Sequence, residues 1–258
     1  MLKTDKYYWH RYVDLYQTLF EKAKATRKIE TVVEWGVLKG ESIAWLHSVF
    51  PDAEIHGLDI VAEMPNWPKH DRIIYHQVNQ NEPAAIQAFY SSITPPDFII
   101  EDGSHFPRHQ SDCLRIGFKS LRVGGTYILE DIHTAYCAII DKSRLLRHRV
   151  LNRLKLRFPS RLNLNSLSLL LALEHYRDLK LSDHRFLEGL ARDSDFSVDD
   201  VVYLSDNIGT YSLFRRNKLP LKCWRCGGSN YEFRTLRCEC GADVFGISDS
   251  MSYILTKK

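Results

Sequence analysis

The chain has 258 residues, of which 44% are hydrophobic and 26% are charged, and its formal net charge at pH 7 is +3. This length accommodates one α/β domain with a large core plus a small appendage, and the small net charge excludes a general preference for polyanions. The sequence has no signal-peptide core, and its longest apolar run, residues 167–173, is too short to span a membrane, so we expect a cytoplasmic protein.

Predicted helices and strands alternate along the first half of the chain. Residues 4–28 have the apolar spacing of a helix, and residues 29–35 are typical of a buried strand, which leads into a helix that ends near residue 50. Further predicted strands cover residues 54–60, 72–78, 98–100 and 126–129, with helices predicted at 83–91 and 108–120. This alternation predicts an α/β fold with a doubly wound, Rossmann-like, mostly parallel sheet.

The turn after the first predicted strand indicates the class of cofactor. Its pattern, Glu34-x-Gly36-x-x-x-Gly40, differs from the G-x-G-x-x-G turn that holds a dinucleotide pyrophosphate. Such an acidic turn without a phosphate cradle suits S-adenosylmethionine, which carries a positive amine and a sulfonium. Asp59 could accept hydrogen bonds from the ribose hydroxyls, and Gln80 could reach the adenine. The predicted cofactor-binding residues are Glu34, Gly36, Gly40, Ser42, Asp59 and Gln80.

Acidic residues follow two neighbouring strands of the predicted sheet. Asp102-Gly103-Ser104-His105 comes after the fourth strand, and Glu130-Asp131 after the fifth. Because ligands bind at the carboxyl ends of parallel strands, we expect Asp102, Glu130 and Asp131 to form a magnesium site. Asp102 and His105 are the predicted catalytic residues, with His105 accepting a proton from a metal-held hydroxyl. The alternative is that these residues only cap helices and turns.

Residues 142–161 form a strongly basic segment. They contain eight Lys and Arg residues, and no acidic residue lies between Asp141 and Glu174. The apolar positions within the segment have helical spacing, which predicts a basic amphipathic helix. Such a helix could contact an anionic membrane surface, grip a phosphorylated ligand or cover the site as a lid. Residues 163–175 predict a leucine-rich helix, which we interpret as a contact in a homo-oligomer.

Four cysteines are clustered late in the chain. Residues 201–207 and 210–215 predict an antiparallel hairpin that closes the sheet, and the cysteine pattern follows it. The cysteines occur as Cys223-x-x-Cys226-Gly227 and Cys238-x-Cys240-Gly241, which resembles a zinc ribbon although the second pair is C-x-C. Four thiolates leave no open coordination position, so the predicted zinc is structural. Free thiols or a redox pair remain the alternatives.

Short motifs spread over residues 4–136 resemble one known family. They are Thr4-Asp5-Lys6 with His10 and Tyr12, Glu34-x-Gly36 with Gly40-x-Ser42-x-x-Trp45, Gly57-Leu58-Asp59-Ile60, Asp102-Gly103-Ser104-His105, and Gly124-Gly125-x-Tyr127-x-x-Glu130-Asp131-x-x-Thr134-x-Tyr136. Together they resemble the metal-dependent sugar O-methyltransferases of macrolide biosynthesis, of the mycinamicin type, and related cephalosporin hydroxylase-like proteins. The resemblance implies that Asp102, Glu130 and Asp131 bind magnesium and that His105 is the base.

These observations predict a magnesium-dependent O-methyltransferase that uses S-adenosylmethionine and acts on a sugar, nucleotide sugar or glycoconjugate. We expect residues 1–217 to form the methyltransferase domain, with a lid insertion at 142–195, and residues 218–258 to form a zinc-ribbon-like tail. An RNA-binding methyltransferase, a catechol-type enzyme and a non-catalytic scaffold are the alternatives. Nucleic acid is not an expected partner, because the aromatic–basic interleaving typical of single-strand binding is missing.

Overall fold

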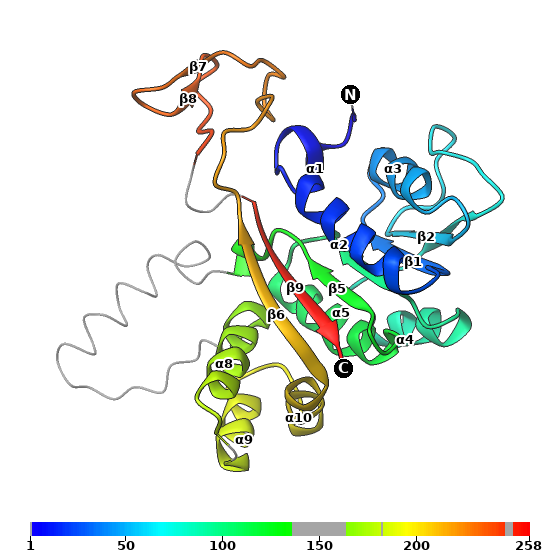
Figure 1. Cartoon of the computed structure of the whole chain (residues 1–258), viewed down its shortest axis with the longest axis vertical. Coiled ribbons are helices and arrows are strands. Elements are labelled where there is room, and N and C mark those ends of the chain that lie inside the picture. Colours follow the sequence, from blue (N-terminus) through cyan, green and yellow to red (C-terminus); the bar gives the residue numbers. More distant parts are fainter. Residues whose placement is uncertain (1, 136–163, 182, 246–249) are drawn as a thin grey trace.

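A single mixed sheet organises the structure, which is a computed structural model that describes residues 2–135, 164–181, 183–245 and 250–258. The sheet has seven strands in the order β3-β2-β1-β4-β5-β9-β6. Figure 1 shows β9 between β5 and β6. Their bounds are β1 (Thr31–Trp35), β2 (Glu54–Asp59), β3 (Ile73–Gln77), β4 (Phe98–Glu101), β5 (Thr126–Leu129), β6 (Ile208–Arg215) and β9 (Met251–Lys257). Strands β1 to β5 are parallel, and β9 is antiparallel to both neighbours. The predicted doubly wound, mostly parallel sheet is confirmed.

Helices cover both faces of the sheet. The helices are α1 (Asp5–Tyr8), α2 (Val13–Thr26), α3 (Glu41–Val49), α4 (Pro83–Ser92), α5 (Pro107–Ser120), α8 (Ser166–Asp178), α9 (His184–Arg192) and α10 (Val198–Asn207), with a 3₁₀ turn at Ile132–Ala135. Helices α2 and α3 pack on one face, and α4, α5 and α8 to α10 pack on the other. Successive strand residues point to opposite faces, so Val32 joins one core and Val33 the other.

The N-terminal helix expected over residues 4–28 is divided in two. Helix α1 ends at Tyr8 and α2 begins at Val13. Between them Arg11 is left-handed, with φ of 61°. The turn is closed by the backbone N–H of Tyr12, which donates to the carbonyl of Lys6 (2.8 Å). Residues 4–12, which we call the N-terminal strap, therefore leave the line of α2.

The strand pairing at the end of the sheet differs from the prediction. Residues 201–207 belong to helix α10, so the hairpin expected with residues 210–215 is wrong. Ser197 begins this helix with a capping box, in which its hydroxyl accepts from the backbone N–H of Asp200 and the Asp200 carboxylate accepts from the backbone N–H of Ser197. The antiparallel partner of β6 is instead β9, which lies beyond the cysteines. Residues 218–258 are thus not a separate tail, because residues 251–257 return to the sheet.

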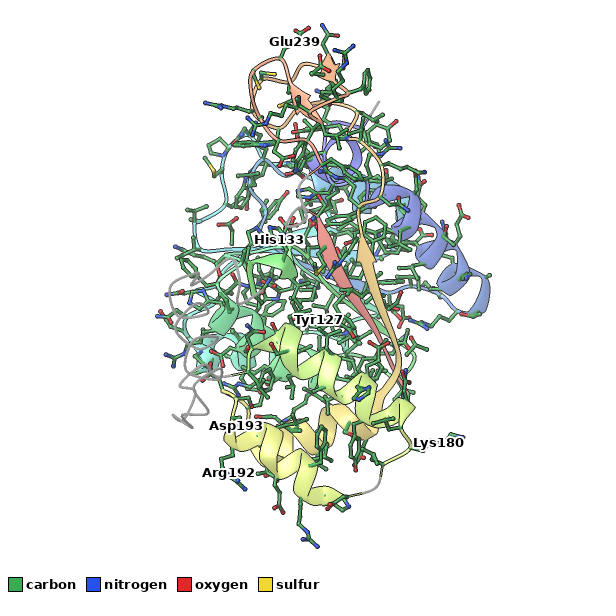
Figure 2. All side chains as sticks on the ribbon, turned by 90° about the vertical axis from the view of Figure 1, so that its left-hand side faces the viewer. Tyr127, His133, Lys180, Arg192, Asp193 and Glu239 are labelled. Atoms are coloured by element: carbon green, nitrogen blue, oxygen red, sulfur yellow. The ribbon has the colours of Figure 1, made fainter. Side chains whose placement is uncertain are left out.

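The segment between β6 and β9 carries the cysteines and two short strands, β7 (Tyr231–Glu232) and β8 (Arg237–Cys238). We call residues 219–245 the cysteine module. In Figure 2 its Glu239 lies at the opposite end of the molecule from Lys180 and Arg192, which mark the α8 and α9 region. The basic segment 142–161, with its proposed membrane or lid role, lies outside the described residues. None of the helices in the described parts of the chain is long and apolar enough to cross a membrane.

Candidate active site

The carboxyl ends of β1, β4 and β5 lie side by side and carry the predicted motifs. Trp35 is paired with Glu101, and Glu101 with Leu129, so the turns that follow these residues share one edge of the sheet. A cavity of about 380 Å³ opens at this edge. Its walls come from the turns after β1, β2, β3, β4 and β5 and from the N-terminal strap. The sequence correctly places the candidate residues at one edge.

Three side chains at this cavity form a group suited to a divalent cation. Asp102, His105 and Asp131 each offer one ligand atom, and these atoms all lie within 4.8 Å of one another. The Nε2 atom of His105 is 3.8 Å from Oδ1 of Asp102. The carboxylate oxygens of Asp102 and Asp131 are donors that suit a hard cation such as magnesium, and the His105 imidazole lies beside them, so these residues fit the expected site.

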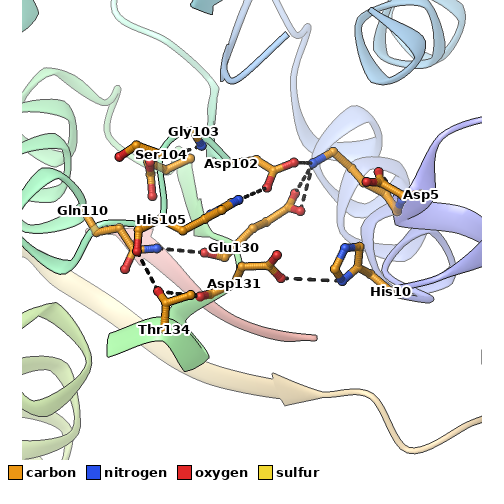
Figure 3. Close-up of polar contacts among 12 residues, drawn as sticks. Asp5, His10, Asp102, Gly103, Ser104, His105, Gln110, Glu130, Asp131 and Thr134 are labelled. Atoms are coloured by element: carbon orange, nitrogen blue, oxygen red, sulfur yellow. Dashed lines mark hydrogen bonds and ion pairs between the residues drawn. The ribbon is translucent and has the colours of Figure 1, made fainter. Parts of the chain in front are cut away.

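The backbone around this group is unusual. His105 and Asp131 both have left-handed backbones, with φ of 56° and 48°. The hydroxyl of Thr134 reaches the carbonyl oxygens of both residues, at 2.8 Å from His105 and 3.1 Å from Asp131 (Figure 3). Left-handed backbone at residues other than glycine is uncommon and clusters at functional sites. Thr134 therefore fixes the position of the turn after β4 relative to the turn after β5.

Glu130, predicted as a third magnesium ligand, is bonded to Lys6. The Lys6 ammonium lies 2.8 Å from both carboxylate oxygens of Glu130 and also contacts Asp102 Oδ2. The Lys6 side chain is 1% exposed and that of Glu130 is 0% exposed. Burial and the Asp102 charge raise the pKa of Glu130 well above its usual value. The role of Glu130 as a metal ligand remains a prediction.

Lys6 also links Asp102 to Glu34, which begins the predicted cofactor-binding turn after β1. Its ammonium is 3.4 Å from Oε1 of Glu34, which is 0% exposed. Burial lowers the pKa of Lys6, but Asp102, Glu130 and Glu34 outweigh it, and the pKa lies well above its usual value. The ammonium is therefore the positive centre of a cluster of three carboxylates, of which Glu34 and Glu130 are fully buried.

Two further strap residues contact Asp131. The hydroxyl of Tyr12 donates to Asp131 Oδ1 (3.0 Å), and Nδ1 of His10 is 3.5 Å from the same oxygen. The rings of His10 and Tyr12 are stacked, with centroids 5.0 Å apart. Burial raises the pKa of Asp131, but the adjacent His10, His105 and His133 outweigh it and hold the pKa below its usual value. The N-terminal motif contains Lys6, His10 and Tyr12, but we predicted no role for any of them from the sequence.

The predicted cofactor residues divide into two groups. Gly36, Ser42, Asp59 and Gln80 line the cavity, whereas Glu34 and Gly40 do not. Glu34 lies beneath the turn and accepts a hydrogen bond from the Ser42 hydroxyl (2.7 Å), and burial raises its pKa to about 7. Its contact with the cofactor therefore remains a prediction.

Asp59 and Gln80 both hold turns in place. One Asp59 oxygen accepts hydrogen bonds from the backbone N–H groups of Val37 (2.9 Å) and Leu38 (3.3 Å). The Gln80 amide donates to Glu101 (2.7 Å) and accepts from the backbone N–H of Ser104 (2.8 Å). Each side chain orders a wall of the cavity, and their expected contacts to ribose and adenine remain predictions.

Gly36 allows the turn after β1 to approach the turn after β4. Its φ is +86°, and a Cβ atom at this position would lie 2.1 Å from the carbonyl oxygen of Asp102. No side chain fits there without moving backbone. The two turns are therefore in contact only because residue 36 is glycine.

The four late cysteines come together in the cysteine module. Their Sγ atoms all lie within 4.8 Å of one another, with 3.7 Å between Cys223 and Cys240 and 3.5 Å between Cys226 and Cys238. Tetrahedral ligation at the usual zinc–sulfur distance of about 2.3 Å would separate sulfur atoms by about 3.8 Å. The observed separations fit such a site, and no disulfide joins these cysteines.

The sheet order and the helices on both faces define a Rossmann-like fold, and a solved methyltransferase has a similar fold. The MycE methyltransferase of the mycinamycin biosynthetic pathway, solved in complex with Mg and SAH, matches with a TM-score of 0.57 at 20% identity, covering 95% of this chain and 48% of that chain. At this identity the likeness shows the fold. No family model matches the chain.

Curated relatives match part of the sequence. One is the 8-demethyl-8-(2-methoxy-alpha-L-rhamnosyl)-tetracenomycin-C 3'-O-methyltransferase of Streptomyces olivaceus, 33% identical over 140 residues, which cover 50% of this chain and 34% of the relative. Another is the mycinamicin VI 2''-O-methyltransferase of Micromonospora griseorubida, 35% identical over 103 residues, which cover 40% of this chain and 25% of the relative. The resemblance to macrolide sugar O-methyltransferases is confirmed, although the chain spans only about a third of these relatives or less.

Proposed function

We propose that this chain is an S-adenosylmethionine-dependent, divalent-cation-assisted O-methyltransferase that acts on a hydroxyl of a sugar or glycoconjugate. The observation that carries the proposal is the position of the Asp102, His105 and Asp131 group on the wall of the cavity formed by the predicted cofactor turns. We call this cavity the donor cavity, because it would hold S-adenosylmethionine. With the cation site at the same sheet edge, the substrate hydroxyl and the methyl group of S-adenosylmethionine would lie close together. The names of the relatives support a sugar as the substrate.

Each residue has a role that its contacts support. Asp102 and Asp131 would hold the cation, which would supply Lewis acidity toward two neighbouring hydroxyls of the substrate. His105 would accept the proton of the attacking hydroxyl, because magnesium prefers oxygen ligands and leaves the imidazole available. The turns held by Asp59 and Gln80 would orient the donor methyl in line with that oxygen, and such positioning supplies much of the rate enhancement.

A transfer assay tests the proposal. The purified chain would be incubated with labelled S-adenosylmethionine and nucleotide sugars, glycosides, a catechol or RNA, with magnesium or with EDTA. We expect transfer to a sugar hydroxyl that EDTA and Asp131→Asn abolish and that Asp178→Asn, an exposed change on α8, preserves. Full transfer in EDTA would refute the role of the cation, and transfer to the catechol or RNA alone would establish one of the alternatives.

Donor binding is a separate part of the same test. Asp59→Ala removes a carboxylate that holds the turn after β1 and that we assign to the ribose hydroxyls. Hydrogen bonds to a charged group contribute about 1.5–3 kcal/mol, so the affinity for S-adenosylmethionine should fall roughly tenfold to a hundredfold. Unchanged affinity in calorimetry would reject this assignment.

We also propose that Cys223, Cys226, Cys238 and Cys240 hold one structural zinc ion. The sulfur separations support this, and thiolates prefer zinc, whereas carboxylates prefer magnesium. Elemental analysis should find close to one zinc per chain, lost in Cys226→Ser and retained in Asp131→Asn. Purified protein without zinc, or zinc lost on changing Asp131, would contradict the assignment.

A further inference from the structure

The N-terminal strap contacts the site at one end and the cysteine module at the other. On the site side, Lys6 bonds to Asp102 and Glu130, and His10 approaches Asp131. The strap also forms one wall of the cavity through Thr4, Asp5, Tyr8 and His10. A contact that fixes the position of the strap therefore also determines the shape of the donor cavity.

Trp9 is the centre of the contact with the cysteine module. It is 5% exposed and lies in a small apolar cluster with Cys223, Cys238, Ala242 and Val244. The Arg216 guanidinium lies 4.5 Å from its ring, donates to the Trp9 carbonyl (2.9 Å) and also donates to the Val244 carbonyl (2.9 Å). Cys223 and Cys238, which contact Trp9 in this cluster, are thus also two of the four proposed zinc ligands.

Backbone hydrogen bonds join the same two segments. The N–H groups of Leu221 and Lys222 both donate to the carbonyl of Tyr8, at 2.7 Å and 3.3 Å. The Arg11 guanidinium donates to the carbonyl of Leu219 (3.2 Å). These bonds involve Tyr8, next to Trp9, and Arg11, two residues beyond it, so the contact includes backbone as well as side chains.

Neither segment is stable by itself. Helix α1 has four residues, and isolated helices this short are unstable in water. The cysteine module has a cluster of five buried residues, one of which is Trp9 of the strap, and strands of two residues each. Small units of this kind depend on a metal or disulfides to fold. Zinc would therefore order the module, and the module would order the strap.

We propose that the zinc-loaded cysteine module is a positioning element for the active site: it clamps Trp9 and thereby holds the part of the strap around it, with His10, against Asp131 and the donor cavity. This inference rests on the proposed zinc site and donor site. Loss of zinc should loosen the part of the strap around Trp9 and disturb one wall of the cavity, while the Lys6 ion pairs and the sheet remain in place.

The test separates the clamp from general stability. Trp9→Ala breaks the contact without touching a cysteine, Cys226→Ser removes the metal, and Phe233→Ala is a matched control at an exposed residue of the module (72% exposed). Three quantities would be measured: zinc content, hydrogen exchange of the amides in residues 4–12, and S-adenosylmethionine affinity by calorimetry without added divalent cation.

We expect Trp9→Ala to keep its zinc, while both Trp9→Ala and Cys226→Ser speed exchange of the strap amides at least tenfold and weaken donor binding at least tenfold. Amides of β1 and β4 should keep their protection, and Phe233→Ala should match the unmodified chain. Unchanged strap exchange in Trp9→Ala would overturn the inference. Equal loss of protection in β1 and β4 would also overturn it, because the module would then stabilise the sheet. If the unmodified chain binds no donor, the proposed function fails, and the exchange data still decide the inference.

Discussion

Replacing Lys6 with methionine should reveal how much the buried cluster depends on one positive charge. Methionine keeps most of the apolar stem and removes the ammonium that contacts Asp102 and Glu130 and approaches Glu34. Glu34 and Glu130 are fully buried, so their carboxylates would lose their cation in a site that water does not reach. Removing one partner of a buried ion pair costs about 3–5 kcal/mol, which is a large part of the stability of an ordinary domain.

The effect should depend on pH with a defined sign. Burial already raises the pKa of Glu34 to about 7 and that of Glu130 well above its usual value while Lys6 is present, and removing the ammonium raises both further. A carboxyl whose pKa is higher in the folded than in the unfolded state takes up a proton on folding. The free energy of unfolding therefore falls as the pH rises. The destabilisation by Lys6→Met should therefore be larger at pH 8 than at pH 6.

Urea unfolding at the two pH values measures both effects. Lys69→Met is the control, because Lys69 is paired with Glu63 at the surface, and such a pair contributes about 1 kcal/mol or less. A Lys6→Met variant within about 1 kcal/mol of the unmodified chain at both pH values would refute the reasoning. It would mean that the three carboxylates do not need the ammonium as their counter-ion.

Two further predictions concern the folded state. Burial and the neighbouring His76 lower the pKa of His56 to about 4, so the unfolded state binds the proton more readily. Stability should fall by roughly 2 kcal/mol more between pH 7 and pH 5 in the unmodified chain than in His56→Leu, as measured by urea unfolding, and equal falls would contradict the assignment. Gly36→Ala should destabilise the fold by more than about 1 kcal/mol through its positive φ, with further loss from the clash with Asp102. Gly189→Ala, where nothing lies within 4 Å of the new Cβ atom, should stabilise helix α9 by about 0.5–1 kcal/mol, and similar unfolding midpoints for the two variants would contradict this.

Local sequence patterns were sufficient for the parallel part of the sheet and for the position of the site. The buried runs at 31–35, 98–101 and 126–129 are short and apolar, and polar motifs follow each of them. Because parallel strands bring their carboxyl ends to one edge, the order of strands and motifs alone placed Asp102, His105 and Asp131 together. The spacing of the cysteines likewise predicted their cluster, since it depends on one short hairpin.

Contacts between distant residues could not be predicted in this way. The bond between Lys6 and Glu130 joins residues 124 positions apart, and no local pattern records it. Val201 and Val202 favour a strand by propensity, but the Ser197 capping box and burial of one face, with Val201 and Leu204, make a helix.

The sequence by itself thus determined the five parallel strands, the side chains that follow them and the cysteines that cluster, because each of these depends on near neighbours. Only the tertiary structure decided that β9 lies between β5 and β6 and that the strap joins the cysteine module to the carboxylates. The strand at residues 251–257 was not predicted, and its place in the sheet is decided by its pairing with both neighbours, which are distant in the sequence.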